Sequence, residues 1–505
     1  MPNVADSVWM QAASAPDRVA VTGSGRRLTF AQLRDGAARV AGAVLDSGLQ
    51  AGSRVLLVAP SVPEFPVVYY GLHAAGMIVV TPNTMATRRE VEYLLKDADC
   101  SLALAWHEVG PAPVEAAQAL GVPCWTFGVD ATEIVASEPL GNPQDRDLSD
   151  TAVLLYTSGT TGSPKGAELT VGNLRACVET FRKAMHVTPQ DVFGTALPLF
   201  HIYGQATMMG TAFLSGAAIS LAEVFDAAEL VARMETGGIT ILSAVPTMYD
   251  ALLRIPAEAP SAGGSRLRMA TSGAASLPPA VLRSFESRFG APILEGYGLT
   301  ETTGTTTFNS IDRDRKVGTT GRPLPGVELR ILDAKGDEVT PGDVGEIEVR
   351  APSVMKGYWR RPDATAQAFH DGWFRTGDLG VVDRDGDLRI VGRIKDLIIR
   401  GGYNVYPREV EEVLYEHEDI LEVAVVGVPD KYWGEEVCAL VVVRDGSGLD
   451  AGQIRNWAKE RLSAYKVPHR IRFTRALPVG PSGKVLKRAI NIDAFLEPEI
   501  VAGNR

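Results

Sequence analysis

The chain has 505 residues, of which 45% are hydrophobic and 22% are charged, and this length and balance fit a globular protein of more than one domain. Its formal net charge of −11 at pH 7 argues against non-specific binding to nucleic acid and against a basic helix that lies on a membrane. Four scattered cysteines without a C-x-x-C pair, and only seven histidines, argue against a zinc site and a disulfide framework.

The N-terminal residues carry neither the basic region nor the apolar core of a secretory signal, so we expect a cytoplasmic protein with reduced thiols. The longest apolar stretch, residues 67–80, has 14 residues and contains His73. It is too short to span a bilayer. We therefore predict a core helix that runs into a strand, and no transmembrane segment.

Helix and strand patterns alternate along the first two thirds of the chain. Thr29 is a suitable N-cap for a helix with Leu33, Ala37, Val40 and Val44 on one face. Residues 54–58 predict a strand, and further helices are expected after Thr170 and after Ser276. Such alternation predicts α/β layers with mostly parallel sheets.

A segment rich in glycine and hydroxyl side chains, YTSGTTGSPKG at residues 156–166, follows a short apolar run at residues 152–156. The run predicts a buried strand that ends in a loop, where backbone N–H groups, hydroxyls and Lys165 could bind a nucleotide triphosphate. Ordinary loops have the same composition. The segment is not a Walker A motif, because Gly159 and Gly162 are three residues apart and a glycine follows the lysine.

The alternation of helices and strands ends at about residue 318. Short alternating strands with glycine-rich turns follow at about residues 318–391, which predicts a small β-rich subdomain. Within it, DRDGDLRI at residues 383–390 begins like a calcium loop. Its sixth position is Leu388 rather than glycine and its twelfth is Ile394 rather than glutamate, so a hairpin turn is expected. A compact α+β unit is expected beyond residues 392–395, with a helix after Pro407 and strands near residues 422–428 and 437–443.

Six segments along the chain together resemble the adenylate-forming superfamily of acyl-CoA synthetases, firefly-type luciferases and adenylation domains of peptide synthetases. They are YTSGTTGSPKG at 156–166, LPLFHIYG at 197–204, EGYGLTE at 295–301, WFRTGDL at 373–379, GRIKDLIIRGGYNVYP at 392–407 and PVGPSGK at 478–484. They occur in the order of the family, and the resemblance is greatest to ligases that join fatty or aryl acids to CoA.

The resemblance implies an α/β fold with a large N-terminal domain at residues 1–394 and a small mobile α+β domain at residues 395–505. It also implies an enzyme that uses ATP, Mg²⁺ and coenzyme A on a carboxylic acid. The acid would first form an acyl-adenylate and release pyrophosphate. The thiol of CoA would then displace AMP.

The resemblance also implies roles for the residues that match each motif. Residues expected at the β- and γ-phosphates are Thr157, Ser158, Thr160, Thr161 and Lys165. Residues expected around the adenine are Ser272, Gly273, Ala274, Ala275, Gly296 and Tyr297. Gly159, Glu295 and Gly298 are also expected in the ATP-binding site. Thr300 is expected at the α-phosphate, Glu301 at Mg²⁺, and Asp378 with Arg393 at the ribose. Without the family, Tyr297 would be a core aromatic residue and Asp378 a turn residue.

Two further groups of residues follow from the C-terminal motifs. Lys484 is expected to bridge the substrate carboxylate and the α-phosphate, although by composition it is one surface lysine among many. Lys395 is expected to be the hinge of the small domain. Gly401, Gly402 and Tyr403 are expected to form a tunnel wall near the thiol arm of CoA, where glycine permits close approach.

The acid is expected to bind in a pocket that is mostly small and apolar. Its expected lining residues are His201, Tyr203, Gly204, Val245, Pro246, Thr247, Gly298, Thr302 and Thr303. The resemblance gives His201 a positional role, and the alternative is a packed core histidine. This lining favours a medium- or long-chain fatty acid, an aryl acid or a bulky polycyclic acid over a dicarboxylate.

Several alternatives stay open at this stage. A separate carrier protein could replace CoA as the thiol acceptor, and an amino-acid adenylation role or a luciferase role is less favoured. A non-catalytic nucleotide-binding regulator is the alternative of a different class, but each motif keeps its chemically active residue. We expect a monomer or homodimer that binds small molecules and no nucleic acid.

Overall fold

The computed structural model of the chain describes residues 3–131, 134, 136, 138–157, 163–236, 238–256, 265–480 and 485–495. The chain forms two compact units, one of Met1–Leu329 with Glu348–Arg375, and one of Arg330–Ile347 with Thr376–Arg505. Residues 376–394, assigned above to the large domain, thus belong to the same compact unit as residues 395–505. The expected domain boundary near Lys395 stays a prediction.

The larger sheet of the first unit has nine strands in the order β15-β14-β13-β12-β11-β9-β10-β1-β2. Its strands are β1 (Val19–Gly23), β2 (Arg26–Thr29), β9 (Val192–Thr195), β10 (Ala218–Leu221), β11 (Ile241–Ala244), β12 (Met269–Ser272), β13 (Ile293–Tyr297), β14 (Thr307–Phe308) and β15 (Arg322–Pro323). From β13 to β1 all neighbours run parallel, whereas β2, β14 and β15 at the two ends pair antiparallel. The sheet is therefore mostly parallel, as expected.

A second sheet of the first unit has seven strands in the order β18-β8-β7-β4-β3-β5-β6. Its strands are β3 (Arg54–Val58), β4 (Ile78–Val80), β5 (Cys100–Trp106), β6 (Cys124–Phe127), β7 (Thr151–Thr157), β8 (Lys165–Thr170) and β18 (Gly357–Tyr358). The strands from β7 to β6 are parallel, but β8 returns antiparallel to β7, so that Thr157 lies opposite Lys165. The expected phosphate loop thus connects two strands of one hairpin.

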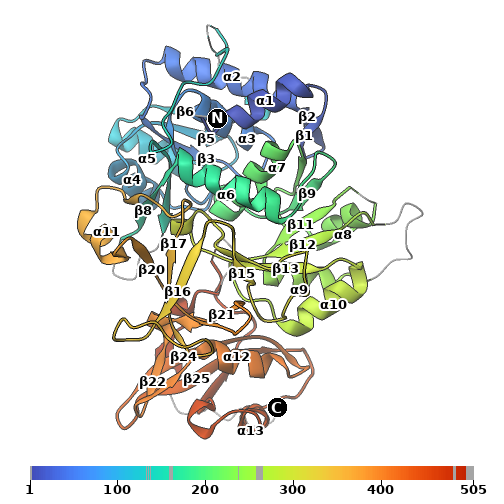
Figure 1. The fold of residues 1–505 in the computed structure, drawn as a ribbon, viewed down its shortest axis with the longest axis vertical. Coiled ribbons are helices and arrows are strands. Elements are labelled where there is room, and N and C mark those ends of the chain that lie inside the picture. Colours follow the sequence, from blue (N-terminus) through green and yellow to red (C-terminus); the bar gives the residue numbers. More distant parts are fainter. Residues whose placement is uncertain are drawn as a thin grey trace. The chain divides into compact units, whose positions relative to one another are not determined.

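Helices cover both sheets of the first unit (Figure 1). They are α1 (Asp6–Ser14), α2 (Phe30–Asp46), α3 (Glu64–Ala74), α4 (Arg88–Asp97), α5 (Ala112–Leu120), α6 (Val171–Ala184), α7 (Thr211–Ser215), α8 (Ala227–Glu235), α9 (Pro246–Arg254), α10 (Pro279–Phe289) and α11 (Pro362–Ala368). The main core joins α2, α3, α6 and α7 to buried residues of both sheets. A second core packs α8–α10 on the outer face of the nine-stranded sheet, and another packs α4 and α5 on the seven-stranded sheet. The result is an α-β-α-β-α stack of layers.

The helices begin where the sequence predicts them. Thr29 and Thr170 each form a capping box, in which the threonine hydroxyl accepts from the N3 backbone and the N3 side chain accepts from the cap. Residues 67–80 run from α3 into β4, which confirms the interpretation of the apolar stretch as core. Among the described residues, no helix combines the length and apolar character needed to cross a membrane.

The second unit contains a five-stranded sheet with the order β23-β22-β25-β24 and β26 beside β25. Its elements are β22 (Ile398–Arg400), β23 (Tyr403–Val405), α12 (Pro407–Tyr415), β24 (Ile420–Asp430), β25 (Gly434–Val443), α13 (Ala451–Lys459) and β26 (Arg470–Phe473). Both helices contribute to its core, through Val410 and Leu414 of α12 and Ile454 of α13. The mixed α/β fold with a smaller α+β region is confirmed.

The β-rich region consists of short strands, as the sequence predicts. They are β16 (Glu328–Leu332), β17 (Gly345–Arg350), β19 (Phe369–His370), β20 (Trp373–Val382) and β21 (Leu388–Arg393). β20 and β21 pair antiparallel, so residues 383–387 form the expected hairpin turn rather than a calcium loop. The division between the two compact units falls inside β16, β17 and β20, so the chain passes from one unit to the other within these strands.

Candidate active site

Most predicted site residues of the first unit follow the carboxyl ends of neighbouring parallel strands. β9, β11, β12 and β13 are adjacent, and the register places Ala244 beside Ser272 and Ser272 beside Glu295. The chain then continues into the segments that carry His201, Val245, Gly273 and Gly298. Ligands of open α/β sheets bind at this edge, so the fold brings together residues from four separate segments of the chain.

Tyr203 links two of these motifs. It opens a π-helix, Tyr203–Gly210, a form that occurs mostly at functional sites. Its hydroxyl lies 2.7 Å from Thr271 Oγ1, and Thr271 Oγ1 donates to Ser243 Oγ at 3.1 Å. A Cβ at Gly273 would lie 3.4 Å from the Tyr203 ring, so this ring packs against the backbone expected near the adenine.

The segment after β12 carries two features typical of a binding site. Ser272 is 2% exposed, and its hydroxyl has no hydrogen-bond partner among the described residues. Such a buried polar atom is costly unless a ligand or water pairs with it. Ala274 has a φ of 71°, a left-handed conformation that is uncommon for a residue with a side chain. Strain of this kind is concentrated at functional sites.

The segment 298–304 folds back tightly on itself. A Cβ at Gly298 would lie 2.2 Å from the Gly304 carbonyl oxygen, so only glycine fits there. Thr303 has a φ of 57°, and its hydroxyl donates to the Ser353 carbonyl at 2.6 Å. Thr302 Oγ1 accepts from the Leu299 N–H at 2.9 Å. The two threonines therefore fix this turn, and the acid-lining role expected of them stays a prediction.

Glu301 lies at the point where this turn meets the β7–β8 hairpin. The residue is 8% exposed. Its Oε1 accepts hydrogen bonds from Thr157 Oγ1 and from Tyr358 Oη, both at 3.0 Å. Lys165 Nζ lies 5.2 Å from the centroid of the same Tyr358 ring. The structure thus brings Thr157, Lys165 and Glu301 together around Tyr358.

The Glu301 carboxylate fits a shared magnesium ion. Its Oε2 accepts no hydrogen bond, and the carboxylate forms no ion pair, within the described part of the chain. A buried charge of this kind is costly unless a cation compensates it. The described residues contain no group of three His, Cys, Asp or Glu side chains that could hold a metal. Mg²⁺ commonly binds one or two carboxylates together with substrate phosphates and waters, and such a site needs no further protein carboxylate.

The expected acid-pocket residues are positioned by backbone turns. Tyr203 N–H donates to His201 Nδ1 at 3.3 Å, so this nitrogen is an acceptor and the ring orientation is tied to the start of the π-helix. A Cβ at Gly204 would lie 2.5 Å from the Pro198 carbonyl oxygen, so glycine permits a close turn there. Val245 is buried and precedes α9, whereas Thr247 is exposed.

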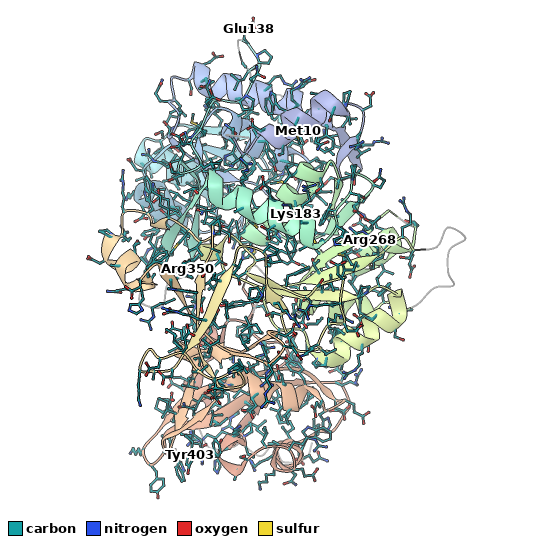
Figure 2. All side chains as sticks on the ribbon, in the orientation of Figure 1. Met10, Glu138, Lys183, Arg268, Arg350 and Tyr403 are labelled. Atoms are coloured by element: carbon teal, nitrogen blue, oxygen red, sulfur yellow. The ribbon has the colours of Figure 1, made fainter. Side chains whose placement is uncertain are left out.

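In the second unit, Asp378 and Arg393 lie opposite each other in the β20–β21 hairpin. Arg393 Nε lies 3.0 Å from Asp378 Oδ1, and the side chains are 48% and 5% exposed. Gly401 has a φ of 57°, and its N–H donates to the Trp433 carbonyl at 2.7 Å. Tyr403 is 61% exposed and projects from the ribbon (Figure 2). Lys395 is exposed in a short 3₁₀ turn, Ile394–Asp396.

Several predicted residues lie outside the part of the chain that the structure describes. They are Ser158, Gly159, Thr160, Thr161 and Lys484. Their roles stay predictions. The other members of the expected phosphate group, Thr157 and Lys165, lie opposite each other in β7 and β8.

Sequence reasoning missed the role of Tyr358. It lies in the two-residue strand β18, and 57 residues separate it from Glu301. Tyr156, which donates to Asp97 Oδ2 at 2.8 Å, was also missed as a support of the hairpin. The only available signal was a glycine followed by two aromatic residues, Tyr358 and Trp359, which is common in strands.

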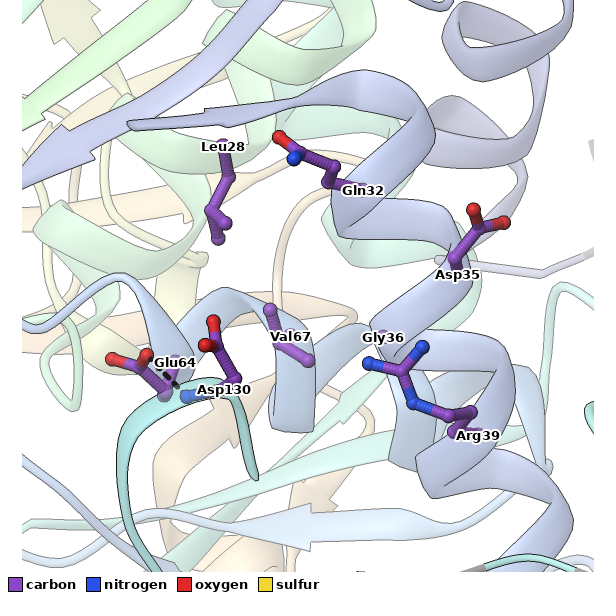
Figure 3. A pocket seen from close by; sticks show the side chains of 8 residues that line it. All are labelled: Leu28, Gln32, Asp35, Gly36, Arg39, Glu64, Val67 and Asp130. Carbon is purple, nitrogen blue, oxygen red and sulfur yellow. Dashed lines mark hydrogen bonds between the residues drawn. The ribbon is translucent and has the colours of Figure 1, made fainter. Parts of the chain in front are cut away.

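A separate pocket of about 240 Å³ lies between α2 and α3 (Figure 3). None of the predicted site residues lines it. Its buried carboxylate, Glu64, already accepts from the Asp130 N–H at 2.9 Å and pairs with Arg26. Because this charge is compensated within the protein, the pocket lacks the unpaired carboxylate that distinguishes Glu301.

The chain matches known protein families and curated relatives. The family described as AMP-binding enzyme matches residues 8–359, and the AMP-binding enzyme C-terminal domain matches residues 409–484. The chain is 36% identical to a long-chain-fatty-acid–CoA ligase of Bacillus subtilis, over 95% of this chain and 92% of the relative. It is also 36% identical to a feruloyl-CoA synthase of an Amycolatopsis species, over 94% of this chain and 96% of the relative.

A solved structure gives the same result. The crystal structure of ATP-bound MatB from Rhodopseudomonas palustris superposes with a TM-score of 0.90 at 35% identity, covering 96% of this chain and 98% of that one. The chain is therefore a member of the AMP-binding enzyme family, an AMP-forming acid–thiol ligase that uses ATP, Mg²⁺ and CoA.

Proposed function

We propose that this ligase activates a carboxylic acid in two steps, first as an acyl-adenylate with release of pyrophosphate, and then as a CoA thioester with release of AMP. The observation that carries the proposal is the buried Glu301 carboxylate: its Oε2 accepts from no donor among the described residues, and its Oε1 is hydrogen-bonded to Tyr358, whose ring lies beside Lys165. A cation between Oε2 and the phosphates of ATP would compensate the charge of Glu301.

The chemistry explains why such residues are needed. A carboxylate is a poor acyl donor, because its charge repels nucleophiles and oxide is a poor leaving group. Attack on the α-phosphorus of ATP replaces oxide with AMP as the leaving group. Both steps pass through anion-rich transition states, so fixed donors and cations supply most of the catalysis. Bound Mg²⁺ neutralises phosphate charge.

In the first unit, we assign Thr157 and Lys165 to the β- and γ-phosphates, Thr300 to the α-phosphate and Glu301 to Mg²⁺. The backbone after β12 and the ring of Tyr297 are assigned to the adenine. Support comes from the unpartnered Ser272 hydroxyl and the strained Ala274 backbone, which lie in the same segment. Ser158, Gly159, Thr160 and Thr161 complete the proposed phosphate loop.

In the second unit, we assign Asp378 and Arg393 to the ribose hydroxyls, and Lys484 to the substrate carboxylate and the α-phosphate. The ion pair between Asp378 and Arg393 supports the first assignment, because it orients a carboxylate acceptor beside a donor. Lys395 is proposed as the hinge that lets this unit serve both steps. Gly401, Gly402 and Tyr403 are proposed to line the path of the CoA thiol.

For the acid, we propose a medium- or long-chain fatty, aryl or bulky polycyclic acid. The proposed lining contains no carboxylate and no lysine or arginine. It consists of His201, Tyr203, Gly204, Val245, Pro246, Thr247, Gly298, Thr302 and Thr303. A second carboxylate on the substrate would find no cation in this set. Relatives named for long-chain fatty acids and for ferulate are compatible with such a pocket.

An acid screen tests the proposal. Purified protein, ATP, Mg²⁺ and CoA are incubated with fatty, aryl, polycyclic and dicarboxylic acids, and AMP release and thioester mass are measured. We expect one of the first three classes to give equal amounts of AMP and thioester. A carrier protein with a phosphopantetheine arm replaces CoA in a parallel series. AMP formation that needs no acid, or a preference for dicarboxylates, would contradict the proposal.

Lys484→Ala separates the two steps. Removing this ammonium is expected to slow pyrophosphate exchange by about 10²–10³-fold, as for the loss of other transition-state donors. Thioester formation from pre-made acyl-adenylate and CoA should stay within about twofold of the unsubstituted protein. The control is Lys487→Ala, which removes a nearby lysine. An equal loss in both assays would refute the assignment.

A further inference from the structure

Tyr358 meets both charged residues of the proposed phosphate and metal site. Its hydroxyl donates to Glu301 Oε1 at 3.0 Å, and its ring lies 5.2 Å from Lys165 Nζ. A lysine ammonium within about 6 Å of a ring centroid is attracted by the negative face of the ring. One side chain therefore contacts the anion through its polar tip and the cation through its apolar face.

The two oxygens of Glu301 are treated differently by the protein. Oε1 accepts from both Thr157 and Tyr358 at 3.0 Å. Oε2 accepts from no donor in the described part of the chain. Two donors on one oxygen fix the rotation of the carboxylate, because any rotation about the Cγ–Cδ bond would lengthen both hydrogen bonds. The second oxygen is then left as the ligand position.

The tyrosine itself is held by its backbone. Its N–H donates to Thr365 Oγ1 at 2.9 Å, and it pairs with Ala167 of β8 in the seven-stranded sheet. The preceding Gly357 has a φ of 155°, and a Cβ there would lie 2.8 Å from Thr365. The ring position is thus set by α11 and β8, independently of Glu301 and Lys165.

We infer that Tyr358 is a positioning residue that orients the Glu301 carboxylate toward Mg²⁺ and holds the Lys165 ammonium beside the same phosphates. The inference rests on the proposed function, since it assigns the support of the residues named there. Tyr358 touches neither ATP nor the acid in this account. It acts through Glu301 by its hydroxyl and through Lys165 by its ring, and two substitutions separate these effects.

Direct metal binding is the first test. Mn²⁺ replaces Mg²⁺ as a paramagnetic probe, and its binding to the protein with α,β-methylene-ATP is followed by electron paramagnetic resonance. Tyr358→Phe keeps the ring and removes the hydroxyl. We expect the Mn²⁺ dissociation constant to rise by about tenfold, the lower end of the range for residues that support a metal ligand, because Thr157 still donates to Oε1.

Tyr156→Phe is the matched control, because it removes from β7 of the same sheet another tyrosine hydroxyl that donates to a carboxylate, Asp97 of α4. Its Mn²⁺ dissociation constant should change by less than about twofold. Equal constants for Tyr358→Phe and the unsubstituted protein would overturn the inference. So would an equal rise in both variants, since that would indicate general loosening of the hairpin.

Tyr358→Leu tests the contact with Lys165. Tyr358→Leu should weaken Mn²⁺ binding as Tyr358→Phe does. Its KM for ATP should also be about threefold higher than that of Tyr358→Phe, because one cation–π contact is lost. Identical KM values for the two variants would remove Lys165 from the inference. Pyrophosphate exchange by the unsubstituted protein is measured in parallel. Its absence with every acid would refute the proposed function, whereas exchange together with unchanged Mn²⁺ binding would refute only the role of Tyr358.

Discussion

Two buried carboxylates, one in each compact unit, are balanced in different ways. Asp378 of the second unit has the guanidinium of Arg393 beside it at 3.0 Å. Glu301 of the first unit has two neutral hydroxyl donors and no cation partner in the described part of the chain. Both residues are less than 10% exposed. The protein therefore compensates the charge of Asp378 with an arginine, whereas the described residues provide no cation for the charge of Glu301.

This difference indicates where a cationic ligand is needed. A buried acid that already has an arginine is compensated without any ligand. A buried acid with hydroxyl donors alone keeps part of its desolvation cost, which a bound cation would offset. The uncompensated charge of Glu301 lowers the stability of the ligand-free protein, and binding of Mg²⁺ and ATP offsets this free-energy cost. Four substitutions test this comparison.

Glu301→Gln should have the largest effect on activity. The amide oxygen still accepts from Thr157 and Tyr358, but the charge for Mg²⁺ is lost, so pyrophosphate exchange should fall by about 10²–10³-fold. The ligand-free protein should melt at the same or a higher temperature, because an uncompensated buried charge is removed. Exchange assays and calorimetry measure the two effects.

Glu168→Gln is the control for Glu301→Gln. Glu168 is a mostly buried glutamate of β8 that pairs with Lys356 at 3.1 Å. Here the opposite pattern is expected, a lower melting temperature with exchange retained. If both glutamates gave the same pattern, the contrast between compensated and uncompensated acids would fail.

Lys395→Pro tests whether the second unit is needed for a separate step, the formation of the thioester. Proline fixes φ and restricts the preceding residue, so movement at this position should be hindered. Pyrophosphate exchange should stay near normal while thioester synthesis falls by about tenfold or more. Single-turnover assays of each step measure this, with Lys395→Ala as the control. An unchanged thioester rate would argue against the hinge.

Arg393→Gln should remove the guanidinium that pairs with the buried Asp378 carboxylate. Because Arg393 is half-exposed, the loss should be moderate, about 1–3 kcal/mol in the free energy of unfolding. Urea unfolding measures it, and Arg389→Gln, an exposed arginine of the same strand, should cost less than about 0.5 kcal/mol. Equal stabilities of the two variants would show that Asp378 does not depend on this partner.

Asp191→Asn should give the smallest effect, and it depends on pH. Burial raises the pKa of Asp191, but hydrogen bonds from Arg268, Thr188 and Thr240 outweigh this and place it below the ordinary value. The ionised carboxylate thus stabilises the fold at pH values above about 4, and this contribution is lost as the pH falls through the lowered pKa.

Urea unfolding at pH 7 should therefore show Asp191→Asn less stable by about 1 kcal/mol, with the difference shrinking toward acid pH. Arg268, labelled in Figure 2, is the partner of this acid at 2.8 Å. Pyrophosphate exchange should be unchanged, because the pair lies outside the proposed site. A stability difference that grows in acid would contradict the assigned sign.

Local patterns predicted much of the fold. Thr29 and Thr170 were recognised as caps because capping depends on residues within one turn. Alternating apolar segments predicted layers and parallel strands, since periodicity reports burial. The exact ends were less certain: strands were expected near residues 422–428 and 437–443, whereas β24 spans Ile420–Asp430 and β25 spans Gly434–Val443.

Contacts between distant residues could not be predicted in the same way. Glu301 was found through its motif, but its partner Tyr358 is brought to it by the pairing of β18 with β8. No local spacing encodes that pairing. The grouping of residues 330–347 with 376–505 likewise depends on tertiary contacts, whereas the motif at residues 392–407 led to an expected boundary near residue 395.

The passage of the chain through β16, β17 and β20 has a practical consequence. The second compact unit is assembled from two stretches, Arg330–Ile347 and Thr376–Arg505, separated by a return to the first unit. A fragment that starts at Lys395 would keep the sheet of β22 to β26 and its core but would lack β21, which belongs to the same compact unit. Truncation or module exchange with a related ligase must therefore carry both stretches to keep this unit whole.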